Sequence, residues 1–396
     1  MKKNKIFKAK VWMVGRIDQS ILLADFLSKK KILVRWDSFI RLSNRGILRF
    51  FFKDSKRIMN DNLVKIPGNH YLPELIYKLV SFFGFKKGHL FQDLILAYLA
   101  KINFNKNFDI IHGQGPYSLE AATLAKRHGK KFVYEISGQM QATRKKQLKN
   151  VFKRYNLPLD TGINFLQKRR IQEAKIADLI ICPSLILKKE LYKLGFNKKK
   201  IITYKHDSNF SKELIKIKRN KITKKFILMF VGEISIAKGV QHAIFVHKKL
   251  IAAGINSELH LFGKLKHNFL VDDLDKTNIH FHGQVRKKIL KKFYSKSDLF
   301  IFPSYTEGSA LVIYEAMAAG IPIITTKEAG SIVKHKFNGY ICKANDENQM
   351  FLLAKKIAKN KNLRIQMGKN SRKIYLEEMK TSYPKQVMKI YSTIIN

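Results

Sequence analysis

The alternation of apolar strand patterns with helical patterns constrains this chain more than any other feature of its sequence. In the second half, the runs FILMFVG (226–232), ELHLFG (258–263) and LFIFP (299–303) each predict a buried strand that ends in glycine or proline. Residues 240–253, between the first two runs, and 309–319, after the third run, follow a helical pattern. Such an alternation is typical of parallel α/β domains, in which a helix connects each strand to the next.

The first half shows the same alternation, with residues 39–104 harder to place. The segments that predict its strands are Val11–Gly15, Ile32–Trp36, Phe108–His112, Phe132–Ile136 and Leu179–Pro183. A basic, poorly patterned stretch then follows at 211–225. We therefore predict two Rossmann-like domains, 1–210 and 211–375, that face each other across a cleft, and a C-terminal helix within 376–396 that crosses back to the first domain. Parallel sheets bind ligands at the carboxyl ends of their strands, so we expect one shared site in the cleft.

Charge restricts the partners. Lys and Arg number 77 and Asp and Glu 29, which gives a formal net charge of +48. Such a charge favours phosphates, anionic membranes or nucleic acid, but a Lys-rich composition bias explains it equally well. Arginine makes most bidentate phosphate and base contacts, and only 15 of the 77 basic residues are arginine. We therefore expect no specific nucleic-acid partner.

Two aromatic and basic segments of the first half predict contact with an anionic membrane. They are 48–52 (LRFFF, with Arg49 and the adjacent Lys53) and 79–91 (LVSFFGFKKGHLF, with Lys86 and Lys87). Phenylalanine side chains can enter the membrane interface while cations meet the headgroups. The alternative is that these phenylalanines are core residues and the lysines are solvated.

Cysteine usage and hydropathy indicate a cytoplasmic protein, with peripheral attachment to the inner face of the membrane as an option. Cys182 and Cys342 both lie in apolar runs and form no disulfide framework. The N-terminus lacks the long apolar stretch of a signal peptide, and no run is long enough to span a bilayer. We expect no metal site, because His and Cys do not recur at metal-binding spacings and Asp273-Leu-Asp275 is better explained as a solvated loop.

The segment from Pro303 to Pro322 carries the clearest chemical signal. A buried strand ends at Pro303, and a polar turn then opens into a helix that we expect Ser309 to cap. The amides of Ala310, Leu311 and Val312 would then lack helical partners and form an anion site. Glu307 precedes the helix and Glu315 lies within it, so a diphosphate held at the helix start would have a carboxylate near each end. An ordinary strand, turn and helix remains the alternative.

Two further turns contribute candidates. In the stretch from Gly232 to Gly239, Lys238 precedes a helix and can neutralise a phosphate, although it is also one exposed lysine among many. His112 ends a strand just before Gly-Gln-Gly, so we expect it to face the cleft.

Together these motifs make the C-terminal half similar to the retaining glycosyltransferases of family 4, the glycosyl transferases group 1 with the GT-B fold. The matching segments are FVGEISIAKG, LHLFG, IHFHGQV, KKFYSKSDLFIFPSYTEGSALVIYEAMAAGIPIITT and FNGYIC. The first half resembles the family more weakly, through FDIIHGQGPYSLEAATLAKRHGKKFVYEISG and ADLIICPSLILKKELYKLG.

The resemblance implies a nucleotide-sugar donor, a glycan or lipid-linked acceptor, a role in cell-surface polysaccharide synthesis, and no cofactor or metal. It assigns catalysis to Glu307, to which we add His112. The residues that it implies for donor binding are Gly232, Lys238, Arg286, Ser309, Ala310, Leu311 and Glu315.

The chain departs from the family pattern at three turns. Glu233 stands where relatives usually carry arginine, and Ser137 where they carry histidine or arginine. Arg16 replaces the second glycine of the first turn, and its charge could reach the donor from the other domain. These departures keep a second hypothesis open: a weak or inactive GT-B subunit that binds a membrane or a partner transferase. An epimerase or phosphorylase on the same scaffold is disfavoured, because such enzymes generally lack the two spaced glutamates.

Overall fold

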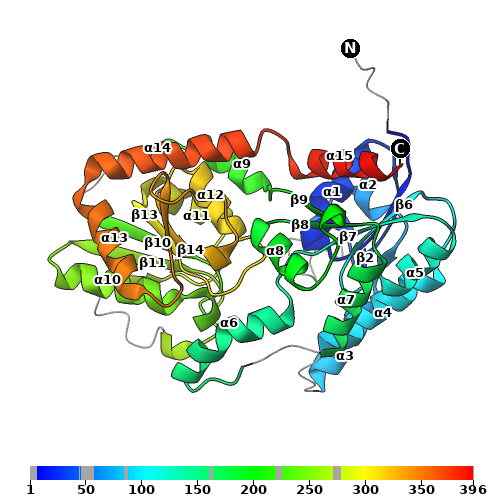
Figure 1. Ribbon diagram of the computed structural model, residues 1–396, viewed down its shortest axis with the longest axis horizontal. Helices are drawn as coiled ribbons and strands as arrows, with labels where there is room; N and C mark the ends of the chain where they lie inside the picture. The colour runs from blue at the N-terminus through cyan, green and yellow to red at the C-terminus, as the bar shows by residue number, and fades with distance from the viewer. Residues whose placement is uncertain are drawn as a thin grey trace, which may run out of the picture.

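Two parallel sheets form the framework of the chain (Figure 1). The computed structural model describes residues 7–43, 45, 58–83, 88–159, 164–219, 225–270 and 278–395, with only the backbone of 17–19. The segment 48–52, Lys53, Lys86, Lys87 and the Asp273-Leu-Asp275 loop lie outside the described residues.

The first sheet has seven strands in the order β5-β2-β1-β6-β7-β8-β9. Its strands are β1 (Val11–Val14), β2 (Leu33–Phe39), β5 (Asn69–His70), β6 (Ile110–Gln114), β7 (Lys131–Glu135), β8 (Leu179–Cys182) and β9 (Ile201–Thr203), and a separate pair is formed by β3 (Leu42–Ser43) and β4 (Ile58–Met59). The helices of this half are α1 (Ile17–Lys29), α2 (Asp61–Val64), α3 (Leu72–Phe82), α4 (Gly88–Ile102), α5 (Leu119–Arg127), α6 (Gln141–Arg154), α7 (Asn164–Ile176) and α8 (Leu185–Lys193). Each strand pairing is parallel, as the alternating pattern predicts.

The second sheet has six strands in the order β12-β11-β10-β13-β14-β15, again with parallel pairings. Its strands are β10 (Phe226–Val231), β11 (Ser257–Phe262), β12 (Ile279–Phe281), β13 (Leu299–Phe302), β14 (Ile323–Thr326) and β15 (Gly339–Cys342). Its helices are α9 (Asn209–Leu214), α10 (Val240–Ala252), α11 (Lys287–Lys296), α12 (Leu311–Ala318), α13 (Glu347–Lys359) and α14 (Lys361–Glu378), and α15 (Tyr383–Ile395) ends the described chain. Leu228, Met229 and Phe230 are fully buried, because helices cover both faces of the central strand β10.

Two helices pack on the half of the chain opposite to their own place in the sequence. Helix α15 lies over the first domain (Figure 1), where Val387 and Tyr391 join the core of the first sheet. Helix α6 belongs to the first half by sequence, yet Leu148 and Val151 join the core of the second sheet. Burial of these apolar side chains therefore ties the halves together at two places.

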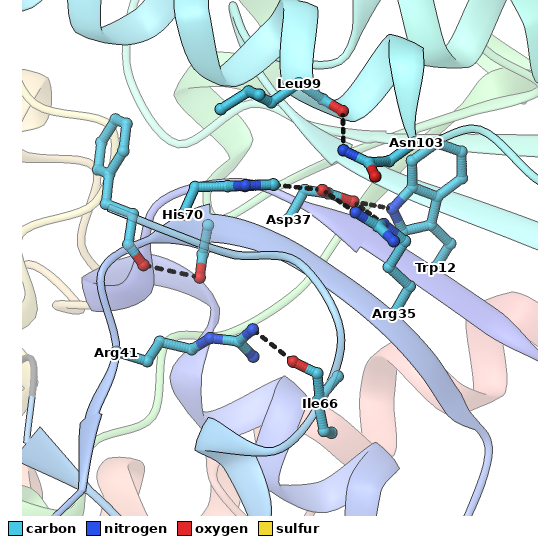
Figure 2. Close-up of polar contacts among 10 residues, drawn as sticks. Trp12, Arg35, Asp37, Arg41, Ile66, His70, Leu99 and Asn103 are labelled. Carbon is cyan, nitrogen blue, oxygen red and sulfur yellow. Dashed lines mark hydrogen bonds and ion pairs between the residues drawn. The ribbon is translucent and has the colours of Figure 1, made fainter. Parts of the chain in front are cut away.

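A buried carboxylate fixes the edge of the first sheet (Figure 2). Asp37 on β2 accepts hydrogen bonds from Nε1 of Trp12 at 2.5 Å, Nε of Arg35 at 2.7 Å and the His70 ring at 2.6 Å. Burial alone would raise the pKa of Asp37, but the hydrogen bonds from His70 and Arg35 hold it below its usual value. Nearby, Arg41 donates to the carbonyl oxygen of Ile66 at 2.6 Å. These polar contacts join β1, β2 and β5 beside the apolar core to which Trp36, Met59 and Leu63 belong.

Candidate active site

The loop between β13 and α12 is the centre of the candidate site. Helix α12 begins at Leu311, and its N-cap is Ala310, whose side chain accepts no hydrogen bond. The prediction that Ser309 caps the helix is therefore wrong. The Ser309 hydroxyl instead lies 3.3 Å from the hydroxyl of Tyr314, because the loop turns its side chain inward.

The anion site at the start of α12 is smaller than the sequence indicates. The amide of Ala310 donates to the carbonyl oxygen of Ala329 at 2.9 Å, so it is not available to a ligand. The amides of Leu311 and Val312 open the helix and have no acceptor within it. Two amides at the positive end of the helix dipole therefore remain to bind an anion.

Lys238 and Glu307 meet directly, although they are distant in sequence. Lys238 ends the short helix Ile236–Lys238, which follows the glycine turn after β10, and its Nζ donates to Oε1 of Glu307. Both side chains are partly accessible, at 25% for Lys238 and 19% for Glu307. The structure thus brings together the lysine and the glutamate that the resemblance assigns to phosphate and donor sugar, at the carboxyl end of the sheet.

Glu315 lies within α12 and is more deeply buried than Lys238 and Glu307. Tyr294 of α11 donates its hydroxyl to Oε2 of Glu315 at 3.0 Å, and both residues are buried. Burial raises the pKa of Glu315 to about 7. A carboxyl group in this state can accept a hydrogen bond from a ligand or, when protonated, donate one. Tyr294 is a site residue that sequence reasoning missed, because its pairing with Glu315 depends on how α11 packs against α12.

A pocket of about 360 Å³ opens at the carboxyl ends of β10, β11 and β12. Its lining residues are Val231, Gly232, Glu233, Phe262, Gly263, Lys264, Gly283, Gln284, Val285 and Leu290. A Cβ on Gly232 would lie 3.0 Å from the Phe302 ring, so any other residue at this turn would have to displace that ring slightly. Glu233, which departs from the family pattern, is one of the lining residues. Arg286 is exposed at the N-cap of α11, outside that lining.

The expectation that His112 faces the cleft is contradicted. His112 is fully buried, with Nε2 3.0 Å from Glu135 and Nδ1 2.8 Å from the hydroxyl of Tyr391. It anchors α15 and does not face the cleft, because both of its ring nitrogens point into the domain. Arg16 pairs with Asp93 of the same domain at 3.2 Å, and whether its charge reaches the donor stays a prediction.

The two domains touch at the loop that carries Glu307. The Ser184 hydroxyl donates to the carbonyl oxygen of Gly308 at 2.5 Å, and the Thr306 hydroxyl donates to the side-chain oxygen of Gln139. A Cβ on Gly308 would lie 1.7 Å from the carbonyl oxygen of Ser137. The approach is possible only because residue 308 is glycine, and it places the end of β7 beside Glu307.

Each half of the chain matches the profile of a known protein family. The profile of the glycosyl transferases group 1 matches residues 211–374, and that of glycosyltransferase family 4 matches residues 65–203. The chain belongs to glycosyltransferase family 4. The matches together cover most of this glycosyltransferase and agree with its two sheets.

Individual relatives are more distant. The chain is 27% identical to the capsular polysaccharide biosynthesis glycosyltransferase CapM of Staphylococcus aureus over 49% of its length, and it spans only 53% of that protein. It is 25% identical to N-acetyl-alpha-D-glucosaminyl L-malate synthase of Bacillus anthracis, over 84% of this chain and 85% of the synthase.

A solved structure extends the likeness to the whole fold. HepE of Anabaena, in a complex with UDP and glucose, aligns with a TM-score of 0.62 at 14% identity and covers 98% of this chain and 100% of its own. At this identity the likeness shows the fold alone, and it confirms the expected GT-B arrangement.

The contact at Gly308 predicts a large effect of one methyl group. Gly308→Ala should separate the domains or distort the Glu307 loop, at a cost of about 1–3 kcal/mol, because the methyl group meets backbone and not a movable side chain. Gly138→Ala is the matched control, since nothing lies within 4 Å of its added Cβ. The measurements are the melting temperature and the radius of gyration from small-angle X-ray scattering. Equal values for both variants would contradict the close approach.

The raised pKa of Glu315 predicts a pH-dependent stability. Below about pH 4.5 the carboxyl group is protonated in the folded and unfolded chain alike. Between pH 4.5 and 7 only the unfolded chain releases this proton, so the folded state loses about 3 kcal/mol, and the loss is complete above the pKa of about 7. Glu315→Gln removes this loss, so its stability relative to wild type should increase from pH 5 to pH 8.

Urea unfolding of both proteins at the two pH values measures the difference. Glu173, whose pKa burial also raises to about 7, is present in both proteins and cancels in the comparison. A constant difference between variant and wild type would show that Glu315 does not titrate in this range.

Proposed function

We propose that this glycosyltransferase moves a hexosyl group from a nucleoside-diphosphate sugar to a glycan or lipid-linked acceptor, with retention of anomeric configuration, in cell-surface polysaccharide synthesis. The observation that carries the proposal is the contact between Lys238 and Glu307 beside the start of α12. A cation, a carboxylate and two unpaired helical amides at one cleft suit a ligand with a diphosphate attached to a hydroxyl-rich sugar.

Each group has a defined part in this proposal. Lys238 and the amides of Leu311 and Val312 stabilise the diphosphate as negative charge develops on it during departure. Glu307 exchanges its ion pair with Lys238 for contacts to the donor sugar. Glu315 accepts hydrogen bonds from the ribose hydroxyls. Positioned charges of this kind account for the largest share of catalysis in many transferases.

The 360 Å³ pocket receives the nucleoside in this scheme. Gly232 and Gly263 expose backbone there, and Phe262 and Leu290 supply apolar surface for a base. Ser309 lies in the diphosphate loop, and Arg286 stands at the rim of the base end. The contact between Gly308 and Ser137 keeps the loop covered by the first domain, which helps to exclude water from the reacting bond.

The comparisons support a nucleotide-sugar donor and a polysaccharide product. CapM is named for capsular polysaccharide biosynthesis, and HepE binds UDP and glucose. Because the chain spans only about half of CapM, its substrate does not transfer by similarity. A panel of uridine, guanosine and adenosine diphosphate sugars, scored for donor hydrolysis and for protection against thermal unfolding, identifies the donor.

The site assignment predicts loss of turnover in two variants. With the donor that the panel selects, Glu307→Gln and Lys238→Ala should each lower kcat by about 10²–10³-fold, the usual cost of removing one charged or hydrogen-bonding transition-state contact. Glu377→Gln and Lys327→Ala, which change exposed residues of the same domain, are the controls. Both site variants should keep the wild-type circular dichroism spectrum. Wild-type turnover in either variant would refute the assignment, and an inverted anomeric centre in the product would refute retention.

The outer face of α3 supports attachment to an anionic membrane. Leu75, Leu79 and Phe82 follow one side of the helix and are 55%, 50% and 84% exposed, and Phe83 at its end is 71% exposed. Helix α4, which lies beside α3 in Figure 1, adds exposed Tyr98. Within the described part of the chain, no helix is long and apolar enough to cross a bilayer. An amphipathic face on a strongly basic protein is suited to the interface of a membrane that carries negative headgroups.

Replacement of Phe82 and Phe83 by serine should therefore reduce co-sedimentation with vesicles that contain anionic lipid. High salt should also reduce it, because each surface cation contributes about 1 kcal/mol at low ionic strength. Leu352→Ser with Leu376→Ser is the control, since these exposed leucines lie on α13 and α14 of the other domain. Equal recovery on neutral and anionic vesicles, or equal recovery of the phenylalanine variant and wild type, would contradict the proposed attachment.

A further inference from the structure

A cluster of imidazoles and one carboxylate lies on a single face of β11 and β12. His260 of β11 pairs in register with His280 of β12. Glu258 precedes His260 by two residues and His282 follows His280 by two, so strand alternation points all four side chains to the same side. Helix α11 covers this side through Phe293, whose ring lies 4.7 Å from that of His260.

Three of these residues converge on one point. One ligand atom each from Glu258, His260 and His280 can be chosen so that all three lie within 4.8 Å of one another. Zinc binds imidazole nitrogen and carboxylate oxygen at about 2.0–2.2 Å, so the ligand atoms of a tetrahedral site lie roughly 3.4 Å apart. Small rotations of Glu258 and of the exposed His280 therefore suffice to complete the geometry.

One buried ring nitrogen of His260 has no hydrogen-bond partner among the described residues. His260 is only 5% exposed, and its Nδ1 lies 2.9 Å from Nε2 of His282. Its buried Nε2 makes no hydrogen bond to any described residue and lies 3.5 Å from Oε2 of Glu258. If Nδ1 donates its proton to His282, Nε2 directs a lone pair at the carboxylate. In this tautomer a cation between the two electron-rich atoms would serve both of them.

In the tautomer in which Nδ1 of His260 donates to His282, their hydrogen bond also has the form of a supporting contact. Metal-binding imidazoles usually donate their second ring nitrogen to a neighbouring group, which fixes the tautomer and the orientation of the ring.

We propose that Glu258, His260 and His280 bind a divalent transition-metal cation, best matched by Zn²⁺, which fastens the edge strand β12 to β11. Two histidines and one carboxylate form a ligand set that zinc accepts. The cation would hold the strands just below the nucleoside pocket, where the amide of Gly263 already donates to the carbonyl oxygen of Gly283 at 2.8 Å. The role is structural, and it does not depend on the proposed glycosyl transfer.

Neighbouring lysines weaken the site without blocking it. Lys225 pairs with Oε1 of Glu258, which leaves Oε2 directed at His260. Lys296 places its ammonium 4.0 Å from the centre of the Phe293 ring and contributes positive charge near His260. Removal of the Lys296 charge should therefore strengthen metal binding, a change opposite in sign to the loss of a ligand.

The test uses the full chain without a histidine tag, stripped of metal with a chelator and titrated with ZnCl₂ by calorimetry. We expect one Zn²⁺ per chain and a higher melting temperature with metal. Titration with Co²⁺ should give the visible absorption bands of a site with mixed nitrogen and oxygen ligands. These readouts do not require a donor sugar, so failure of the zinc site and failure of the proposed transferase activity are separate results.

Four variants make the test specific. His280→Ala and Glu258→Gln, at positions that are not buried, should each weaken Zn²⁺ binding at least about tenfold, and Lys296→Met should strengthen it. His128→Ala removes an exposed histidine of the other domain and should leave binding unchanged. Circular dichroism confirms that each variant is folded. Absence of one-to-one binding in the wild type, or unchanged binding in both ligand variants, would overturn the proposal.

Discussion

The close approach of two backbone segments, at Gly308 and Ser137, is the constraint on which the candidate site depends. The Gly308 loop carries Glu307 and leads into α12, while Ser137 follows β7 of the other domain. Where backbone meets backbone, rotation of side chains cannot relieve a clash, so the distance between the domains is fixed to within a small range at this point. The hydrogen bond from Ser184 to Gly308 fixes the direction of approach as well. The chemistry proposed for Glu307 therefore depends on a contact that neither domain makes alone.

Two packed helices maintain that contact. Helix α6 carries Leu148 and Val151 into the core of the second domain, and α15 carries Tyr391 into the core of the first. At α15 the apolar contact is accompanied by a polar one: Tyr391 binds His112, and Tyr383 donates to Glu135 at 2.9 Å. A buried, hydrogen-bonded network of this kind accepts one geometry and excludes others, because each unmatched polar atom would cost desolvation. Helices α6 and α15 each cross from one domain to the other, and their packing holds the loops at the cleft in place.

The sequence predicts the sheets of this protein better than their edges and connections. Long apolar runs such as FILMFVG locate β10 closely, because a central strand is buried on both faces and must be apolar throughout. The edge strands β5 and β9 are short, and their residues are partly polar, so no run marks them. Helix α9 lies in a stretch that appears unpatterned, since its six residues are too few to show a helical period.

Some residues of the candidate site could likewise be predicted from local sequence, and others could not. Lys238 and Glu307 could be paired from motifs alone, because each follows a strand of one parallel sheet and such positions meet at one edge. His112 follows a strand too, but its direction depends on α15, which the local sequence does not specify. The histidine cluster was missed for a related reason. Its members come from two strands, and only the alternation in ELH and IHFH, read across neighbouring strands, would have indicated it.

The acidic and basic side chains of this protein are distributed differently between the interior and the surface. Among the described residues, nine of the acidic side chains are buried but only three lysine or arginine side chains are. Asp37, Glu135 and Glu315 belong to this buried set, and each is held by hydrogen-bond donors inside a domain. The scarce acidic groups are therefore withdrawn from the surface, which becomes more positive than the count of residues alone implies. A field of that sign raises the local concentration of phosphate-bearing ligands and of anionic lipid at the same time, whatever produced the excess of lysine. The same field opposes any cation bound near the surface, so the metal site proposed at Glu258, His260 and His280 has to bind its cation against that field.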